Sequence, residues 1–144
     1  SHSLGHGDPQ VLAALPARVD ASRVVLAGLH RWDPDQEPFT TGWGLTTIHP
    51  DALHAGSGPL LDWVRSTGCS RVAVHLDVDS IDGDEVAFGL GVEPGGLRSE
   101  TVVRMLADVA EVADVVALTV AEYMPRQALA MQRLLGRLPL LGGS

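Results

Sequence analysis

Val72-Ala-Val-His-Leu-Asp-Val-Asp-Ser-Ile-Asp82 begins with apolar residues and ends among aspartates. Successive side chains of an extended strand point to opposite faces, so this stretch predicts a strand with His75, Asp77 and Asp79 on one face. The other face carries the apolar residues Val74, Leu76 and Val78. A strand that becomes acidic at its carboxyl end suits a parallel sheet, in which ligands bind just beyond the carboxyl ends of the strands.

Two interpretations of these acidic residues are open. Carboxylate oxygens suit hard cations and Mn²⁺, and imidazole suits transition metals, so Asp77, Asp79 and His75 are candidate ligands of a divalent metal. The alternative is that the acidic residues are a solvated strand end, or that Asp79 and Asp82 cap a turn. An Asp-x-Asp spacing by itself is a weak motif.

The rest of the chain predicts an α/β fold. Short apolar runs predict strands at residues 23–28, buried on both faces, at 45–49 and at 114–120. Helical spacing and capping residues predict helices at 10–15, 59–66, 99–112 and 126–138, with a short helical turn after Pro50. Strands that alternate with helices predict right-handed parallel βαβ units.

Two of these helices carry predicted core faces. The helix at 99–112 has Ser99 as its expected cap and a buried stripe formed by Val102, Val103, Leu106, Val109 and Ala110. The last helix is expected to turn Leu129, Leu134 and Leu135 inwards. Residues 83–97 are predicted to be a glycine-rich loop whose main chain can approach a ligand closely.

The predicted sheet brings acidic residues together at one edge. Asp77, Asp79 and Asp82 follow one strand, and Glu122 follows the next strand along the chain. Because the carboxyl ends of parallel strands meet at the same edge, we expect these side chains to lie near one another. This convergence favours the metal interpretation over the solvated strand end.

Composition narrows the class of protein. The 144 residues are 45% hydrophobic and are expected to form one domain, 1–144. A net charge of -8 argues against nucleic-acid binding, and the single cysteine, Cys69, excludes an internal disulfide and is expected to be a buried thiol. No apolar run is long enough for a membrane span and Ser1–Gly5 is unlike a signal peptide, so the cytoplasm is the expected compartment.

Other polar and aromatic residues are assigned ordinary structural roles. We expect packing rather than base stacking from Trp32, Trp43 and Trp63, because no basic groove accompanies them. His2 and His6 have a ligand-like spacing but lie among glycines, so a metal role is disfavoured. The remaining candidates are expected to be loop histidines, His49 and His54, and surface arginines, Arg31 and Arg126.

Three motifs occur in the order His75-Leu-Asp-Val-Asp-Ser-Ile-Asp82, Glu93-Pro-Gly-Gly-Leu97 and Leu118-Thr-Val-Ala-Glu-Tyr-Met-Pro125. They resemble the second signature of the ureohydrolase family (arginase, agmatinase and formimidoylglutamase), the loop that follows it and the next strand. Gly7-Asp-Pro9 and the run at 22–28 also fit the preceding stretch. The resemblance covers nearly the whole chain and is greatest to bacterial arginase-like members.

The resemblance implies a three-layer α/β/α fold with a parallel sheet and two Mn²⁺ ions. In that family a metal-bridging hydroxide attacks the carbon of a guanidino compound and releases urea or a related amide. Asp77 and Asp79 match the two metal-ligand aspartates, and His75 is a further candidate ligand. Glu122 matches the glutamate that pairs with the guanidinium of the substrate.

The chain also departs from the family pattern. Gly83 stands where the family usually has proline. The family's first signatures, which supply four more metal ligands, and the proton-shuttle histidine are expected upstream of Ser1, so no residue here is assigned as a certain catalytic group. The sequence therefore resembles the C-terminal half of an arginase-like protein.

Three hypotheses remain open from the sequence. The first is a metal hydrolase that is incomplete or inactive until the N-terminal half is supplied. The second is a non-catalytic ureohydrolase-like domain that binds or regulates. The third is a structural or interaction fragment that keeps the motifs as relics. The uncovered sheet edge of such a half predicts a homo-oligomer or a complex with the missing half.

Overall fold

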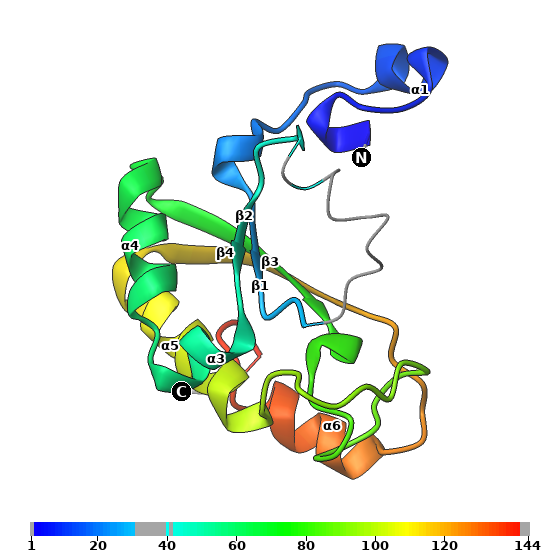
Figure 1. Ribbon diagram of the computed structural model, residues 1–144, viewed down its shortest axis with the longest axis vertical. Coiled ribbons are helices and arrows are strands. Elements are labelled where there is room, and N and C mark those ends of the chain that lie inside the picture. Colours follow the sequence, from blue (N-terminus) through cyan, green and yellow to red (C-terminus); the bar gives the residue numbers. More distant parts are fainter. Residues whose placement is uncertain (1, 31–39, 41, 142–144) are drawn as a thin grey trace. The chain divides into compact units, whose positions relative to one another are not determined.

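The computed structural model describes residues 2–30, 40 and 42–141 (Figure 1). The chain forms two compact units, Ser1–Leu26 with Trp32–Thr47 and Ala27–Arg31 with Ile48–Ser144. The expectation of one domain over 1–144 stays a prediction. Trp32 and Arg31 lie outside the described residues.

Local capping organises the first unit. Its helical elements are η1 (His2–Leu4), α1 (Pro9–Ala14) and η2 (Ala21–Arg23). Asp8 Oδ1 accepts a hydrogen bond from the Gln10 N–H at 2.7 Å, so α1 begins at Pro9 as the Asp-Pro pair predicts. The rings of His6 and Trp43 stack at 4.6 Å, which gives Trp43 the packing role that we expected.

The two short strands are β1 (Val25–Ala27) and β2 (Thr46–Ile48), which pair with each other. β1 is shorter than the predicted strand at 23–28 because Asp20 caps η2 through the Ser22 N–H, and that turn takes up Arg23. All three residues of β1 are half-buried, so the prediction of a strand buried on both faces is wrong for the described structure.

The second unit contains most of the regular structure. Its helices are α3 (Pro50–Ala55), α4 (Gly58–Thr67), α5 (Ser99–Val112) and α6 (Ala128–Leu135). Its strands are β3 (Arg71–Asp77) and β4 (Asp114–Ala121), and η3 (Val78–Ser80) follows β3. Among the helices of the described part of the chain, none has the length and apolar character needed to span a bilayer.

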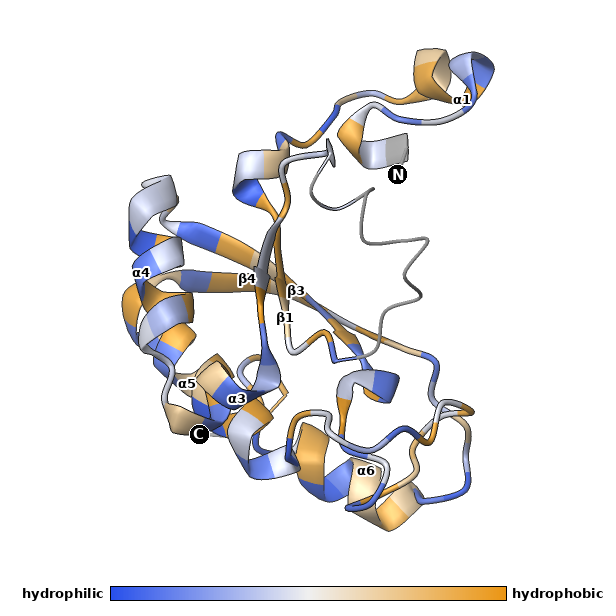
Figure 2. Ribbon diagram, viewed as in Figure 1, coloured by the Kyte–Doolittle hydropathy of each residue, from blue (hydrophilic) through white to orange (hydrophobic). Residues whose placement is uncertain are grey.

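β3 and β4 form the parallel pair that the sequence predicts. His75 lies opposite Thr119 and Asp77 lies opposite Ala121, and the connection between the two strands contains α5. Figure 2 shows hydrophilic residues at the amino ends of both strands and where β3 passes into η3. The β3–α5–β4 unit therefore places the ends of β3 and β4 side by side.

The core lies around α5. This helix packs against α3, α4 and β4, and Figure 1 shows α4 and α5 side by side. Its buried residues are Thr101, Val102, Met105, Leu106 and Val109. Val103 is half-buried and Ala110 is exposed, so the buried stripe is rotated towards Met105 from the one that we predicted.

Three other expectations, for Ser99, Leu129 and Cys69, are wrong. Ser99 does not cap α5: the cap position is Arg98, and the Ser99 N–H donates to Glu85 Oε2 at 2.9 Å. Leu129 does not turn inwards but is 70% exposed. The buried side chains are Met131 and Leu134 in the last helix and Leu138 in the turn after it. Cys69 is half-buried rather than buried.

The core assignment predicts unequal costs for two leucine truncations. Leu53 is 0% exposed and Leu129 is 70% exposed. Because a buried truncation leaves a cavity, Leu53→Ala should lower the free energy of unfolding by about 2–5 kcal/mol. Leu129→Ala is the control and should change it by less than about 0.5 kcal/mol. Urea titrations followed by circular dichroism measure both values, and equal losses would contradict this core.

A charged pair joins α5 to the end of the chain. Arg137 donates to the Glu100 carboxylate through Nη1 and Nη2, with Nη2 to Oε2 at 2.7 Å. The hydrogen bonds from Arg137 hold the pKa of Glu100 below its ordinary value of 4.5, and the same pair raises the pKa of Arg137.

This pair predicts an acid-dependent loss of stability. A carboxyl whose folded pKa is lowered contributes stability above its unfolded pKa, and that contribution disappears as the pH falls through the folded pKa. The melting temperature of the parent should therefore fall more steeply below pH 4.5, the ordinary value, than that of Arg137→Gln. Arg65→Gln, which removes the same charge from α4, should keep the parent's pH dependence. Parallel curves for the parent and Arg137→Gln would refute the pair's role.

Candidate functional site

The carboxyl end of β3 stops at Asp77 because this residue caps the following turn. Asp77 Oδ1 accepts a hydrogen bond from the Asp79 N–H at 3.0 Å, and the Ser80 hydroxyl donates to the Asp77 carbonyl at 2.6 Å. Asp79 consequently lies in η3 rather than on the strand. The predicted shared strand face therefore holds for His75 and Asp77 and is wrong for Asp79.

Asp79 is the most unusual side chain at this edge. Its Oδ2 accepts a hydrogen bond from the Gly91 N–H at 3.2 Å. Its Oδ1 is buried and has no hydrogen-bond partner among the residues that the structure describes. Burying a carboxylate oxygen without compensation is costly, whereas a divalent cation would satisfy it. The orphaned oxygen thus fits a metal ligand, and the Gly91 contact fixes its orientation.

Asp82 has the capping role that the alternative interpretation gave it. Its Oδ1 accepts a hydrogen bond from the Asp84 N–H at 2.9 Å, and its own N–H donates to the Leu97 carbonyl at 2.8 Å. These bonds fasten the start of the loop to its end. Asp82 and Asp79 therefore differ: one closes a turn and the other has an unpaired buried oxygen.

His75 occupies the exposed side of β3. Its Nδ1 lies 2.7 Å from the Thr119 hydroxyl on β4, its partner in the register. The bond fixes the ring along the strand pair, two residues before Asp77. Whether His75 binds metal remains a prediction, and the hydrogen bond to Thr119 occupies one of its two ring nitrogens.

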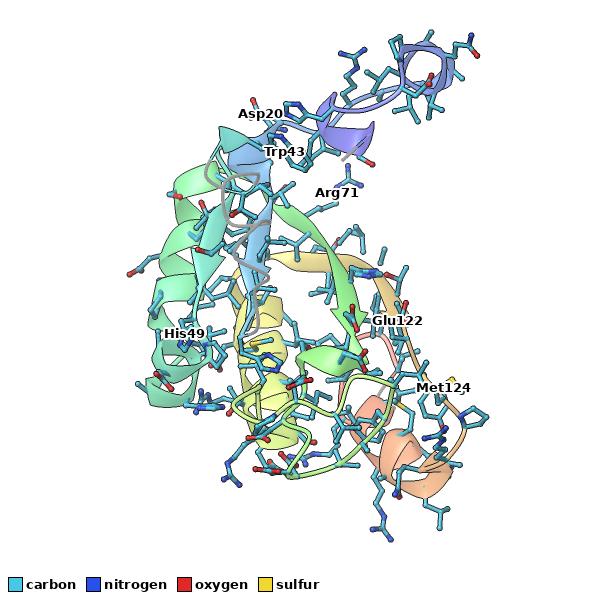
Figure 3. All side chains as sticks on the ribbon, turned by 45° about the vertical axis from the view of Figure 1, so that its right-hand side comes forward. Asp20, Trp43, His49, Arg71, Glu122 and Met124 are labelled. Atoms are coloured by element: carbon cyan, nitrogen blue, oxygen red, sulfur yellow. The ribbon has the colours of Figure 1, made fainter. Side chains whose placement is uncertain are left out.

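Glu122 lies at the carboxyl end of β4, directly after the residue paired with Asp77. Figure 3 shows it beside the end of β3. Its φ of 62° is a left-handed conformation, which a non-glycine residue adopts only at a cost. The Met124 N–H donates to the Phe88 carbonyl at 2.8 Å, so the segment that carries Glu122 is tied to the glycine-rich loop.

The structure brings the predicted acidic residues to one strand edge without assembling a full metal cage. Within residues 2–30, 40 and 42–141, no three His, Cys, Asp or Glu side chains converge closely enough to hold a metal ion. The other histidines have local contacts: His49 Nδ1 accepts from the Asp51 N–H at 3.5 Å, and His54 Nε2 accepts from the Arg98 N–H at 3.3 Å. The donor set present therefore fits part of a site.

Two features of the described structure were not predicted from the sequence. Gly89 and Gly91 lie against the Asp79 carboxylate, whereas the sequence indicated only that the loop could approach some ligand. His30 has a buried Nε2 without a hydrogen-bond partner in the described structure, and its Nδ1 lies 3.4 Å from the Gly28 carbonyl. Its position just after β1 was the only available signal.

A family model described as the arginase family matches residues 1–135. The chain belongs to the arginase family. Three solved members illustrate the relationship. The arginase from Bacillus caldovelox superposes with a TM-score of 0.78 at 21% identity and covers 99% of this chain. The arginase from Entamoeba histolytica, solved with L-ornithine, gives 0.72 at 15% over 87% of the chain. The proclavaminate amidino hydrolase from Streptomyces clavuligerus gives 0.62 at 26% over 74%.

The chain spans about half the length, or less, of these solved arginase-family members: 51%, 44% and 36% of their chains, respectively. No curated protein sequence matches it significantly. The chain thus has a partial arginase-like α/β fold, as the sequence motifs predicted. The family match also spans the stretches that contain Asp77, Asp79 and Glu122.

The left-handed backbone at Glu122 makes a testable prediction. Glycine adopts positive φ without the steric cost that other residues meet, which is about 1 kcal/mol. Glu122→Gly should therefore be more stable to urea than Glu122→Ala by about 1 kcal/mol. Both variants lose the carboxylate, so the comparison isolates the backbone. A Glu122→Gly variant less stable than Glu122→Ala would contradict the left-handed conformation.

Proposed function

We propose that this chain is the substrate-recognising C-terminal half of an arginase-like metal hydrolase that acts on a guanidino compound. Family membership supports the reaction class. The observation that carries the proposal is the buried Oδ1 of Asp79 just after β3, which has no hydrogen-bond partner among the described residues. This is the edge of a parallel sheet at which ligands bind.

Asp77 and Asp79 would bind the metal. Asp79 through Oδ1 and Asp77 through its second carboxylate oxygen would hold Mn²⁺, as part of a site for two ions. When bound, Mn²⁺ supplies Lewis acidity and a hydroxide nucleophile near neutral pH. Hydrolysis would add the oxygen of water to the guanidino carbon and break one of its C–N bonds, releasing urea or a related amide together with the protonated amine.

Glu122 would bind and orient the substrate. Its exposed carboxylate lies next to the end of the strand that carries Asp77. A carboxylate and a guanidinium form two parallel charge-assisted hydrogen bonds, which fix orientation as well as supplying affinity. The strained backbone at Glu122 would pre-set the direction from which the guanidinium meets the metal ligands.

We propose further that the missing metal ligands come from the N-terminal half of an arginase-family chain. The chain spans about half of its solved relatives, which supports a partner of that kind. Within the described residues β3 and β4 pair only with each other, and Val116 and Val120 of β4 are exposed. Unpaired strand edges favour association, and a homo-oligomer is the other form that it can take.

A non-catalytic ureohydrolase-like domain is the alternative function. Two of the candidate ligands already have structural roles: Asp77 caps η3 through Oδ1, and His75 Nδ1 bonds to Thr119. These two hydrogen bonds leave fewer oxygen and nitrogen atoms free to bind a metal. In this alternative the chain would bind a partner or a guanidino ligand without hydrolysing it.

Calorimetric titration with Mn²⁺ tests the metal site directly. The parent chain should give saturable heat, and Asp79→Asn should abolish it or weaken binding at least about tenfold, because the amide supplies a weaker neutral ligand. Asp82→Asn is the matched control: Asp82 caps a turn and should retain the parent's affinity. If Asp79→Asn bound Mn²⁺ with the affinity of the parent, Asp79 would not be a metal ligand.

Urea release from guanidino substrates separates the two functions. Mixed with an N-terminal half that carries the remaining ligands, the chain should release urea in the presence of Mn²⁺. Glu122→Gln should raise KM or lower kcat/KM by at least about 100-fold, since one charge-assisted bidentate pair is lost. Substrate binding without any product would instead support the non-catalytic domain.

A further inference from the structure

The imidazole of His30, three residues after the end of β1, has one nitrogen whose hydrogen-bonding capacity is unused. Its Nε2 is buried and has no hydrogen-bond partner among residues 2–30, 40 and 42–141. On the other side of the ring, Nδ1 lies 3.4 Å from the Gly28 carbonyl oxygen. Because a carbonyl only accepts, this contact requires the proton on Nδ1. In the neutral ring Nε2 therefore carries a lone pair that can accept a hydrogen bond.

The backbone before His30 packs against the segment that follows Asp79. Gly28 has a φ of 89°, and a Cβ there would overlap the side chain of Leu97. The Leu97 N–H in turn donates to the Ser80 carbonyl at 2.8 Å. The chain after β1 thus lies against the residues that continue from η3, at the carboxyl end of β3.

The polar groups that await a partner at this edge are all hydrogen-bond acceptors. Within the described part of the chain, Asp79 Oδ1 and His30 Nε2 are the buried side-chain atoms that have no partner. Glu122 adds an exposed carboxylate at the end of β4. Lone pairs on three side chains, two of them anionic, suit a ligand that is cationic and rich in N–H groups. A guanidinium has this chemistry.

A purely structural role would give His30 a donor within the fold, as it does for two other histidines. His54 Nε2 accepts a hydrogen bond from the Arg98 N–H, and His49 Nδ1 accepts one from the Asp51 N–H. His30 Nε2 has no such donor in the described structure. Burying a polar atom without a partner costs stability, so the imidazole of His30 is a cost to the chain by itself.

We propose that His30 Nε2 accepts a hydrogen bond from an N–H group of the guanidino substrate and selects for that group. The inference rests on the proposed function, because it adds a contact to the same substrate. The bond from Nδ1 to the Gly28 carbonyl keeps the ring in the accepting tautomer. A site that hydrogen-bonds an N–H group rejects an analogue that lacks it, because the acceptor is then left unpaired. This contact needs no metal.

Melting of the 144-residue chain tests whether His30 supports the fold. His30→Leu removes the unpaired nitrogen and keeps an apolar side chain, so the melting temperature should stay within about 2 °C of the parent or rise. His54→Leu is the matched control: it loses the bond from the Arg98 N–H and should melt about 2–5 °C lower. An equal fall in His30→Leu would make His30 a structural residue and overturn the inference.

Titration of the metal-free chain with guanidinium chloride tests the contact. At pH 8, at which an ordinary histidine is neutral, the side-chain ¹⁵N resonance of His30 Nε2 should shift while that of Nδ1 stays. Tetramethylammonium chloride, a cation without N–H groups, is the matched probe and should move neither resonance. His30→Leu should weaken guanidinium binding at least about tenfold, whereas His30→Gln, which keeps an acceptor oxygen, should stay within about threefold of the parent.

The outcomes separate this inference from the proposed function. Guanidinium binding that moves the Nε2 resonance and weakens in His30→Leu supports the inference, and the shift in the parent is decisive even if that variant does not fold. Binding that weakens in Glu122→Gln but not in His30→Leu, with Nε2 unmoved, overturns it and leaves the proposed substrate recognition standing. An equal response to tetramethylammonium also overturns it. A parent that does not bind guanidinium overturns substrate recognition by this chain, and the role of His30 with it.

Discussion

A buried carboxylate oxygen without a hydrogen-bond partner is the constraint on which the rest of the site depends. In the part of the chain that the structure describes, Asp79 Oδ1 is that atom, and burying it without compensation lowers the stability of the fold. Three local features hold this carboxylate in place: the Asp77 cap that turns the chain into η3, the hydrogen bond from the Gly91 N–H to Oδ2, and the close approach of the Gly89 and Gly91 backbone. A divalent cation would satisfy such an oxygen, which is the physical reason for proposing a metal site here.

The fold around this carboxylate follows from sequence patterns where the period is long and clear. The β3–α5–β4 unit was predictable because apolar runs flank a helix of fourteen residues with a regular buried face. The prediction was wrong where side chains compete with the backbone. The Asp77 carboxylate takes the Asp79 N–H and ends the strand early, and Glu85 replaces Ser99 at the start of α5. Leu129 lies in the first turn of α6, on the side of the helix away from the buried Met131 and Leu134.

The candidate site was likewise predictable only in part. The identities of Asp77, Asp79 and Glu122 could be predicted from their places after two strands and from the motif resemblance. Their states could not: the sequence does not distinguish the capping Asp82 from the orphaned Asp79, and it does not reveal the left-handed backbone at Glu122. Gly89 and Gly91 appeared as loop residues, because their meaning depends on a carboxylate ten or more positions earlier in the chain.

The most direct test of the account locates Mn²⁺ on the chain. Paramagnetic Mn²⁺, added far below one equivalent to ¹⁵N-labelled protein, broadens the amide signals nearest to it. With a metal site at the carboxyl end of β3, we expect the signals of Asp79, Gly89, Gly91 and Glu122 to broaden first, while those of α4 stay sharp. Broadening centred elsewhere, for example on Asp62 of α4, or spread evenly over the acidic surface, would contradict a metal site at the carboxyl end of β3.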